Sequence, residues 1–570
     1  MSTREAIAAA TSAKLPEDVR HVYIRRVVCS LGIAMGAVYA YSLRFIMTPD
    51  GIGYLDVASA YLRHDWTTAV NGWWSPVYCW ILAAFLGIFP PTARTEYPLV
   101  HLVTFLCFAF TSWSFYLFWE ALRSAVRGTN SELVGLPILT PLVVDLFVYS
   151  LFFFLFLPLV AVPTPDVFAS AFVFLIAHRL LRFETSDSPT WRDGVLLGVL
   201  FGLAYLTKAI LFYFSIVALA TAVLNARTGS RKPLFVSALL FAIVISPWLI
   251  ALHSSFGVWT LGFSGQLNYA WFVDGTETDR FLEPNGAPLP YFPGSVVFSQ
   301  PTIYKVQTQP HITYLPWYDP ARFYKSRRAS FQLHGQIAAV EKNLIWLRTW
   351  LLITLGPMSV STVSLLLGSG AVMLTILRRY SAIVMPVLVT FAMYGLIFIR
   401  TPRYIAAVTV LLFAIALVSV RFEPTDIRLL RGILGAGLVI FAVVSLPGVV
   451  DVITAAFSSH PDPMIEVAEG LERSGIRNDT HVATVGPAIY AYWARLARVN
   501  LAAEIWNDGV PQFWSADPVR RREMLCVIAN SGVSVIVGDP PQNINLDSWE
   551  PLGSGGFWMH RLSGHDCEQR

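Results

Sequence analysis

Long apolar segments dominate this sequence and restrict it to one broad class of fold. Only 14% of its 570 residues are charged and 55% are hydrophobic, whereas soluble domains carry about 25% charged residues. A helix needs about 20 mainly apolar residues to cross the hydrocarbon core of a bilayer. Runs of about that length lie at residues 27–47, 97–119, 138–161, 166–182, 193–208, 209–225, 233–252, 356–377, 381–399, 404–420 and 431–450. The sequence therefore predicts a mainly α, polytopic membrane protein with about 11 transmembrane helices.

One further apolar run, at residues 78–89, is too short to span and suits a re-entrant or interfacial helix. The positive charges support leaving it out, because cytoplasmic loops carry an excess of lysine and arginine. With about 11 spans, one side receives Arg20, Arg25, Arg26, Arg123, Arg127, Arg179, Arg182, Arg192, Arg227, Arg231, Lys232, Arg378, Arg379, Arg421, Arg428 and Arg431. We therefore expect a cytoplasmic N-terminus and a C-terminus outside, as in an inner or plasma membrane of bacterial type.

These spans divide the chain into three predicted parts. Residues 1–26 form a cytoplasmic tail, residues 27–450 form the transmembrane domain, and residues 451–570 form an extracytoplasmic domain. The transmembrane domain has two long outer loops, at 48–96 and 253–355, in which we expect amphipathic helices.

The last part of the chain shows the pattern of a small α/β domain. Short strands are expected at 481–485 and 533–537, and helices at 464–471 and 520–529. The domain could recognise an acceptor or pack on the loops. Its cysteines, Cys526 and Cys567, could pair if it faces an oxidising space.

The segment directly after the first span carries an unusual number of acids. Its apolar positions Tyr54, Val57, Ala58, Tyr61 and Leu62 follow the spacing of one helical face. The same spacing places Asp56, Ser59 and Arg63 on the opposite face, where we expect solvent. Asp50 comes earlier, in a Pro-Asp-Gly turn, and by itself suits a turn or helix N-cap.

Other charged residues fall on the same predicted outer face. Asp166 opens a span, where an N-cap is the alternative role, and Lys208 lies at the tip of the hairpin 193–225, where a snorkelling lysine is the alternative. Arg400 and Arg403 lie outside, against the charge rule. Carboxylates and cations gathered on one membrane face indicate a site for an anionic ligand.

Several motifs occur in a characteristic order. They are Asp50-Gly51-x-x-Tyr54, Trp73-Trp74-Ser75-Pro76, Asp166 opening a span, Gly202-Leu203-x-x-Leu206-Thr207-Lys208, Pro247-Trp248 and Arg403-Tyr404. The set, over residues 25–420, resembles the GT-C superfamily of membrane glycosyltransferases, nearest to the aminoarabinose transferase and protein O-mannosyltransferase branch. Gly51 is a departure, because the family often has glutamate at that place.

The resemblance implies a function and roles for the matching residues. The chain would move a hexose or pentose from a polyprenyl-phosphate donor to a lipid, glycan or protein acceptor, with inversion. Asp50 and Asp166 would be catalytic, with Asp50 as the base. The resemblance assigns the donor phosphate to Lys208, Arg403 and Arg400, and the sugar or acceptor to Tyr54, Trp74 and Tyr404.

No metal ligands are predicted, and no cofactor is certain. Family members differ in whether they need a divalent ion such as Mg²⁺ or Mn²⁺, and Gly51 weakens the case for a pair of adjacent acidic ligands. The net charge of +4, without any basic block, excludes nucleic acid as a partner.

Two alternatives to an active transferase stay open. A secondary transporter would place acids within its spans and would show paired repeats. No repeat is visible, although Asp145 lies within a span. A catalytically inactive GT-C-like protein of envelope assembly is also consistent with Gly51.

Overall fold

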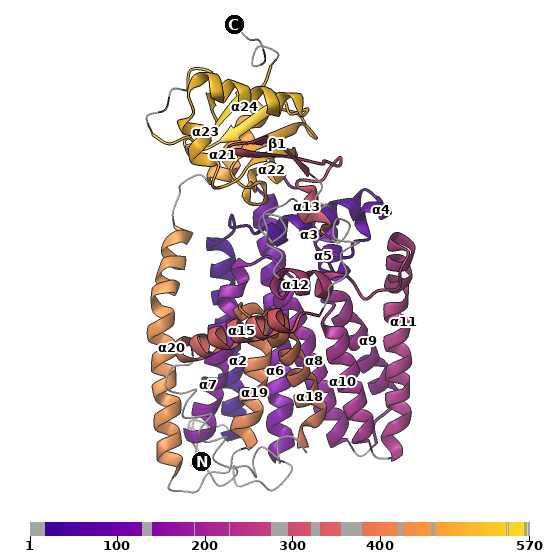
Figure 1. Cartoon of the computed structure of the whole chain (residues 1–570). Helices are drawn as coiled ribbons and strands as arrows, with labels where there is room; N and C mark the ends of the chain where they lie inside the picture. Colours follow the sequence, from indigo (N-terminus) through magenta and orange to yellow (C-terminus); the bar gives the residue numbers. More distant parts are fainter. Residues whose placement is uncertain are drawn as a thin grey trace.

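The computed structural model of the chain is a helical bundle with an α/β domain at one end (Figure 1). It describes residues 17–127, 139–186, 188–226, 228–274, 294–320, 331–354, 379–419, 426–457, 462–542, 544, 546–563 and 567. The predicted span at 356–377 and most of the predicted N-terminal tail lie outside these residues.

The bundle consists of long apolar helices that lie side by side (Figure 1). They are α2 (Glu17–Ser42), α6 (Glu96–Arg127), α7 (Leu139–Phe156), α8 (Asp166–Thr185), α9 (Trp191–Thr207), α10 (Leu211–Leu224), α11 (Arg231–Phe256), α18 (Ser381–Ile397), α19 (Pro402–Ser419) and α20 (Asp426–Ala456). Five segments of the described residues are long and apolar enough to cross a membrane by themselves, within α2, α6, α7 with the turn after it, α11 and α20. The predicted polytopic helical fold is confirmed.

Small residues allow two of these helices to approach closely. Gly194, Gly198 and Gly202 form a stripe along α9, and α11 packs directly on it. A Cβ atom at Gly194 would lie 2.1 Å from the carbonyl oxygen of Pro233. The predicted break at Lys208 is also present, because α9 ends at Thr207 and α10 begins at Leu211.

Shorter helices cover the end of the bundle next to the α/β domain and one of its sides (Figure 1). They are α3 (Pro49–Leu62), α4 (Trp66–Ala69), α5 (Pro76–Ile88), α12 (Ser264–Phe272), α13 (Leu315–Tyr318) and α15 (Leu333–Thr354). Helix α5 is the short apolar run, and it packs against α3 and α6. The apolar face predicted for α3 is buried at Tyr54, Val57 and Ala58.

The expectation that Asp56 faces solvent is wrong. Its side chain is 1% exposed, because the α/β domain covers the polar face of α3 and supplies an arginine to it. Helical periodicity detects a face that is polar, but it does not distinguish water from an ion-pair partner.

The α/β domain is built on one seven-stranded sheet with strand order β1-β2-β4-β3-β5-β7-β6. Its strands are β1 (Gly294–Ser299), β2 (Thr302–Val306), β3 (His481–Val485), β4 (Asn500–Ile505), β5 (Val535–Gly538), β6 (Glu550–Pro551) and β7 (Trp558–Arg561). The central strands β4, β3 and β5 are parallel, and the remaining pairs are antiparallel. The hairpin β1–β2 comes from the segment 253–355, so the sheet joins two distant parts of the chain.

Helices cover both faces of this sheet and bury its apolar side chains. On one face lie α21 (Pro463–Arg473) and α22 (Trp493–Leu496). On the other lie α23 (Val510–Ser515) and α24 (Pro518–Asn530). A disulfide joins Cys526 of α24 to Cys567 near the C-terminus.

Candidate active site

The first turn of α3 sets the position of Asp50. Thr48 caps the helix, since its hydroxyl accepts a hydrogen bond from the amide of Gly51 at 3.2 Å, and Pro49 occupies the first turn. Asp50 is therefore free of the capping role that was its alternative. Its Oδ2 atom instead accepts a hydrogen bond from Nη1 of Arg403 at 3.0 Å.

Gly51 allows α3 to approach the segment that carries the second acid. A Cβ atom on Gly51 would lie 2.6 Å from the sulfur of Met47 and 2.9 Å from Cγ of Pro163. A glutamate side chain has no room there unless these neighbours move. The glycine brings α3 against residues 162–165, directly before Asp166.

Asp166 is the first residue of α8 and collects three partners. Its Oδ2 accepts a hydrogen bond from the hydroxyl of Thr164 at 2.8 Å and lies 3.8 Å from Nε of Arg403. Its Oδ1 is paired with the ammonium of Lys208. Arg403 thus touches both carboxylates and joins Asp50, Asp166 and Lys208 into one cluster.

The four charged residues differ in their access to solvent. Asp166 is 6% exposed, whereas Asp50 is 21% exposed and Lys208 and Arg403 are 22% exposed. Asp50 also retains one oxygen, Oδ1, for which the described residues supply no hydrogen bond. The cluster is anchored at Asp166 and open at Asp50.

Aromatic rings form one wall of the cluster. Tyr404 and Tyr394 are stacked, with their ring centroids 4.7 Å apart. The ammonium of Lys208 lies 4.2 Å from the centroid of the Tyr404 ring, and the guanidinium carbon of Arg403 lies 5.2 Å from it. These cation–π contacts hold both cations over one ring.

The remaining predicted residues lie around this centre in different ways. Arg400 stacks on Phe398 at 4.9 Å, its Nε atom is buried without a hydrogen bond, and the described residues supply no ion pair for it. Tyr54 lies one turn after Asp50 and is 6% exposed. Trp74 packs on Tyr54 at 4.6 Å and donates its indole N–H to a backbone carbonyl, so it supports α3.

Tyr54 keeps its proton in this surrounding. Burial raises the pKa of Tyr54 well above its ordinary value, and the negative charges of Asp50 and Asp166 raise it further, although Arg403 acts in the opposite direction. Its hydroxyl therefore remains a neutral hydrogen-bond donor.

The donor set offers little to a divalent cation. The described residues contain no group of three or more histidine, cysteine, aspartate or glutamate side chains that could hold a metal. A cation placed between Asp50 and Asp166 would have to displace Arg403, which contacts both. The residues present fit an anion between the cations better than a resident metal.

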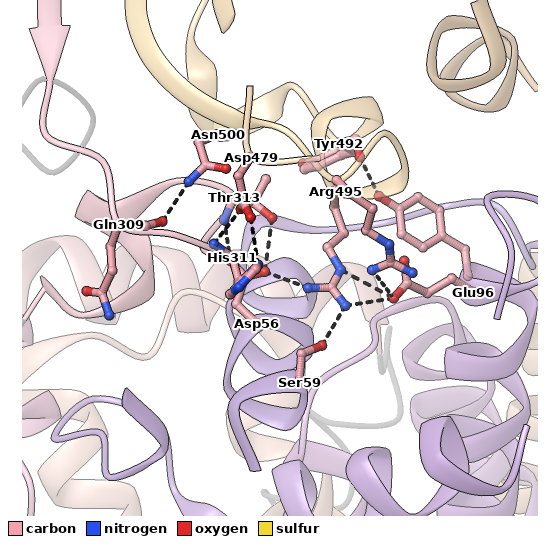
Figure 2. Close-up of polar contacts among 12 residues, drawn as sticks. Asp56, Ser59, Glu96, Gln309, His311, Thr313, Asp479, Tyr492, Arg495 and Asn500 are labelled. Atoms are coloured by element: carbon pink, nitrogen blue, oxygen red, sulfur yellow. Dashed lines mark hydrogen bonds and ion pairs between the residues drawn. The ribbon is translucent and has the colours of Figure 1, made fainter. Parts of the chain in front are cut away.

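A second charged cluster lies farther along α3, and the sequence predictions missed it (Figure 2). Arg495 of the α/β domain contacts Asp56 of α3 and Glu96 at the start of α6. The sequence signal was weak, because the spacing placed Asp56 on the helical face expected to meet solvent and gave no partner for Arg495. Nothing local in the sequence links residues 439 positions apart.

No family model and no curated protein matches this chain. Among solved structures, it is similar to ArnT, the aminoarabinose transferase of Cupriavidus metallidurans, in the apo state, with a TM-score of 0.49 and 12% identity over 95% of this chain and 99% of that chain. The form bound to undecaprenyl phosphate gives a TM-score of 0.48 and 12% identity over the same shares.

A second similar structure is the oligosaccharyltransferase of Archaeoglobus fulgidus, tethered with an acceptor peptide that contains the NVT sequon. Its TM-score is 0.48 and its identity 13%, over 91% of this chain and 69% of that chain. Both proteins belong to the GT-C superfamily that the sequence motifs resemble.

Proposed function

We propose that this protein is a glycosyltransferase that moves a sugar from a polyprenyl-phosphate donor to an acceptor at the outer membrane face. The observation that supports this most is the meeting of Asp50, Asp166, Lys208 and Arg403 at the end of the bundle beneath the α/β domain. A donor of this kind has its lipid tail in the bilayer and its phosphate at the level of these charges.

The cations suit a single phosphate group. Lys208 and Arg403 are balanced by Asp166 and Asp50, whereas Arg400 carries a positive charge without a counter-ion among the described residues. A phosphodiester would neutralise that charge. Arg403 can bind phosphate through its planar fork, and Lys208 acts as a point charge.

Donor binding would also prepare the base. If the phosphate takes the Nη1 donor of Arg403, Asp50 loses the ion pair that engages its Oδ2 atom. Both oxygens of Asp50 can then accept the acceptor hydroxyl. Asp166 keeps Thr164 and Lys208 as partners and continues to hold the cations in place.

The transfer step balances without a further reactant. Asp50 takes the proton of an acceptor hydroxyl, whose oxygen forms a bond to the anomeric carbon. The bond from that carbon to the phosphate oxygen breaks, and polyprenyl phosphate leaves with the electron pair, stabilised by Lys208, Arg403 and Arg400. Attack opposite the phosphate inverts the anomeric carbon. If the acceptor group is a phosphate, it is already anionic and needs no base.

The sides of the membrane are part of this proposal. Arginine and lysine gather at the bundle end away from the α/β domain, for instance Arg25, Arg123 and Arg231, which supports a cytoplasmic location for that end. The disulfide between Cys526 and Cys567 supports an oxidising space around the α/β domain. The active site would then face outward in a plasma membrane of bacterial type.

The transporter alternative depended on Asp145, and this residue has structural partners. Asp145 is 1% exposed, pairs with Arg25 and Arg123, and accepts a hydrogen bond from the indole of Trp119 at 2.9 Å. Its carboxylate is fully occupied near the bundle end opposite the candidate site. It offers no free acid to carry a proton or ion.

An assay with a panel of polyprenyl-phosphate sugars tests the proposal. The wild-type protein should transfer at least one sugar, and Asp50→Asn should lower kcat by about 10²–10⁴-fold, the usual contribution of a general base. Asp65→Asn is the matched control, because Asp65 lies on the same outer segment, caps α4, and asparagine caps equally well. Wild-type turnover in Asp50→Asn would show that the assignment of the base is wrong.

A further inference from the structure

Arg495 of the α/β domain reaches across to two helices of the membrane domain (Figure 2). Its Nη1 atom donates to Oδ1 of Asp56 at 2.8 Å, and its Nη2 atom donates to Oε1 of Glu96 at 2.7 Å. Nη2 also lies 2.7 Å from the hydroxyl of Ser59. One guanidinium therefore contacts two positions of α3 and the first residue of α6.

A second layer of contacts holds the two carboxylates. Thr313 donates its amide to Oδ2 of Asp56 at 3.0 Å and its hydroxyl to Oδ1 at 2.9 Å. Arg498 donates to Oε1 of Glu96 at 3.0 Å. The outer loop, α3, α6 and the α/β domain thus meet at one buried network.

Burial makes this network unlike an ordinary surface ion pair. The side chain of Arg495 is 5% exposed, that of Asp56 is 1% exposed, and that of Glu96 is fully buried. Burial raises the pKa of the Asp56 carboxyl, although Arg495 acts in the opposite direction. Buried charges contribute less to stability than apolar groups of the same volume would, and their best-attested use is to specify one geometry.

The same junction contains a pair that lacks these properties. Arg94, just before α6, donates to Glu469 of α21 at 2.8 Å. The Arg94 side chain is 71% exposed, so water screens this pair and it fixes no geometry. The contrast singles out Arg495 as the contact that can set the position of α3.

We propose that Arg495 is a positioning residue, through which the α/β domain holds α3 so that Asp50 faces Arg403. Asp50 lies six residues before Asp56, about 9 Å along the helix and about 120° around it. The α/β domain therefore contacts one side of α3, at Asp56, while Asp50 faces the bundle from another side of the same helix. This inference rests on the proposed function for its effect on catalysis, but not for its effect on α3.

The kinetic test compares substitutions of the two arginines in the full-length protein in lipid nanodiscs. Arg495→Met should lower kcat at least tenfold at a temperature well below thermal unfolding, while the KM for the donor changes less than twofold. Arg495→Lys keeps the positive charge but loses the planar fork, so its kcat should lie between the values of wild type and Arg495→Met. Arg94→Met should stay within twofold of wild type. Full kcat per folded molecule of Arg495→Met would overturn the proposal.

Hydrogen exchange of the same variants separates this inference from the proposed function. Arg495→Met should speed amide exchange of residues 52–60 in α3 at least tenfold and leave α8 unchanged, and Arg94→Met should change neither. If the wild-type protein transfers no sugar from any donor, only the proposed function fails. The exchange rates of α3 still show whether Arg495 positions this helix. Unchanged exchange of α3 would overturn the role of Arg495. If Arg495→Met does not fold, Arg495→Lys decides by the same measurements.

Discussion

Helix α3 carries an acid of the candidate active site and an acid of the domain junction, and these two acids have opposite surroundings. Asp50 is 21% exposed, pairs with Arg403, and keeps one oxygen without a partner among the described residues. Asp56 is 1% exposed and uses both oxygens, bound by Arg495 and Thr313. Both are aspartates on one helix, each paired with an arginine distant in sequence.

This difference in exposure shows how aspartate–arginine pairs on one helix can suit two different roles. Arg403 and Asp50 lie within reach of water, so in the proposed reaction a phosphate and a hydroxyl would be able to replace their mutual contact. Arg495 and Asp56 have no such access, and removing either leaves a charge buried with too few partners. An ion pair that can be exchanged suits catalysis, and one that cannot suits the joining of domains.

Substitution at the junction acid should produce the largest effect on stability. In Asp56→Asn the charge of Arg495 is left with Glu96 alone, and breaking a buried pair costs about 3 kcal/mol. Thermal unfolding of the purified protein should therefore begin at a clearly lower temperature, whereas Asp50→Asn should leave unfolding unchanged. Equal unfolding temperatures of Asp56→Asn and Asp50→Asn would contradict the proposed difference between the two ion pairs.

Substitution of Arg400, which we propose to contact the donor phosphate, should produce a smaller effect, on binding alone. Arg400→Ala removes one of the charges that we propose for the donor phosphate, and we expect donor affinity to fall about tenfold, which corresponds to about 1.4 kcal/mol. The kcat at saturating donor should change little, and stability should not change, because Arg400 has no ion pair in the described part of the chain. Donor titration measures this. An unchanged dissociation constant for the donor would show that Arg400 does not contribute to donor binding.

A further buried acid, Glu504, has no paired cation among the described residues, and it extends the comparison to pH. Glu504 is 2% exposed and accepts hydrogen bonds from Tyr314 at 3.0 Å and from the amide of Ala488 at 2.7 Å. Burial raises its pKa from 4.5 to about 7, although these hydrogen bonds lower it. The folded state therefore binds a proton that the unfolded state releases between these values.

The sign of the effect follows from this proton. The stability of the α/β domain should fall as pH rises from about 4.5 to about 7, by at most about 1.4 kcal/mol per pH unit, and then level off. Hydrogen exchange of β4 amides in the full-length protein, corrected for the intrinsic pH dependence of exchange, measures this. Glu504→Gln should abolish this dependence, and its persistence in that variant would assign it to another group.

Much of the architecture was predictable because it depends on local hydrophobicity. The apolar runs have the length of a bilayer, and the described ones lie in helices, including the predicted break at Lys208. The ends differ most at α2, which begins at Glu17 and not at residue 27, and at α6, which continues to Arg127 and not only to residue 119. The predicted strands at 481–485 and 533–537 correspond to β3 and β5, and the predicted helices at 464–471 and 520–529 correspond to α21 and α24, whereas β4 was not predicted. Spacing and composition within about 20 residues are enough for such features.

The tertiary structure alone decided which charges meet and what they do. Asp50 meets Arg403 across 353 positions and Asp56 meets Arg495 across 439, so no local pattern could pair them or tell which acid is buried. Likewise, only packing shows that Gly51 leaves room for the contact with Pro163, and that the segment 253–355 supplies two strands of the sheet. Sequence by itself determined the helices and the side of the bundle on which the charges lie. Their pairing depends on long-range packing, because an ion pair forms only where the fold brings two distant side chains within a few ångströms.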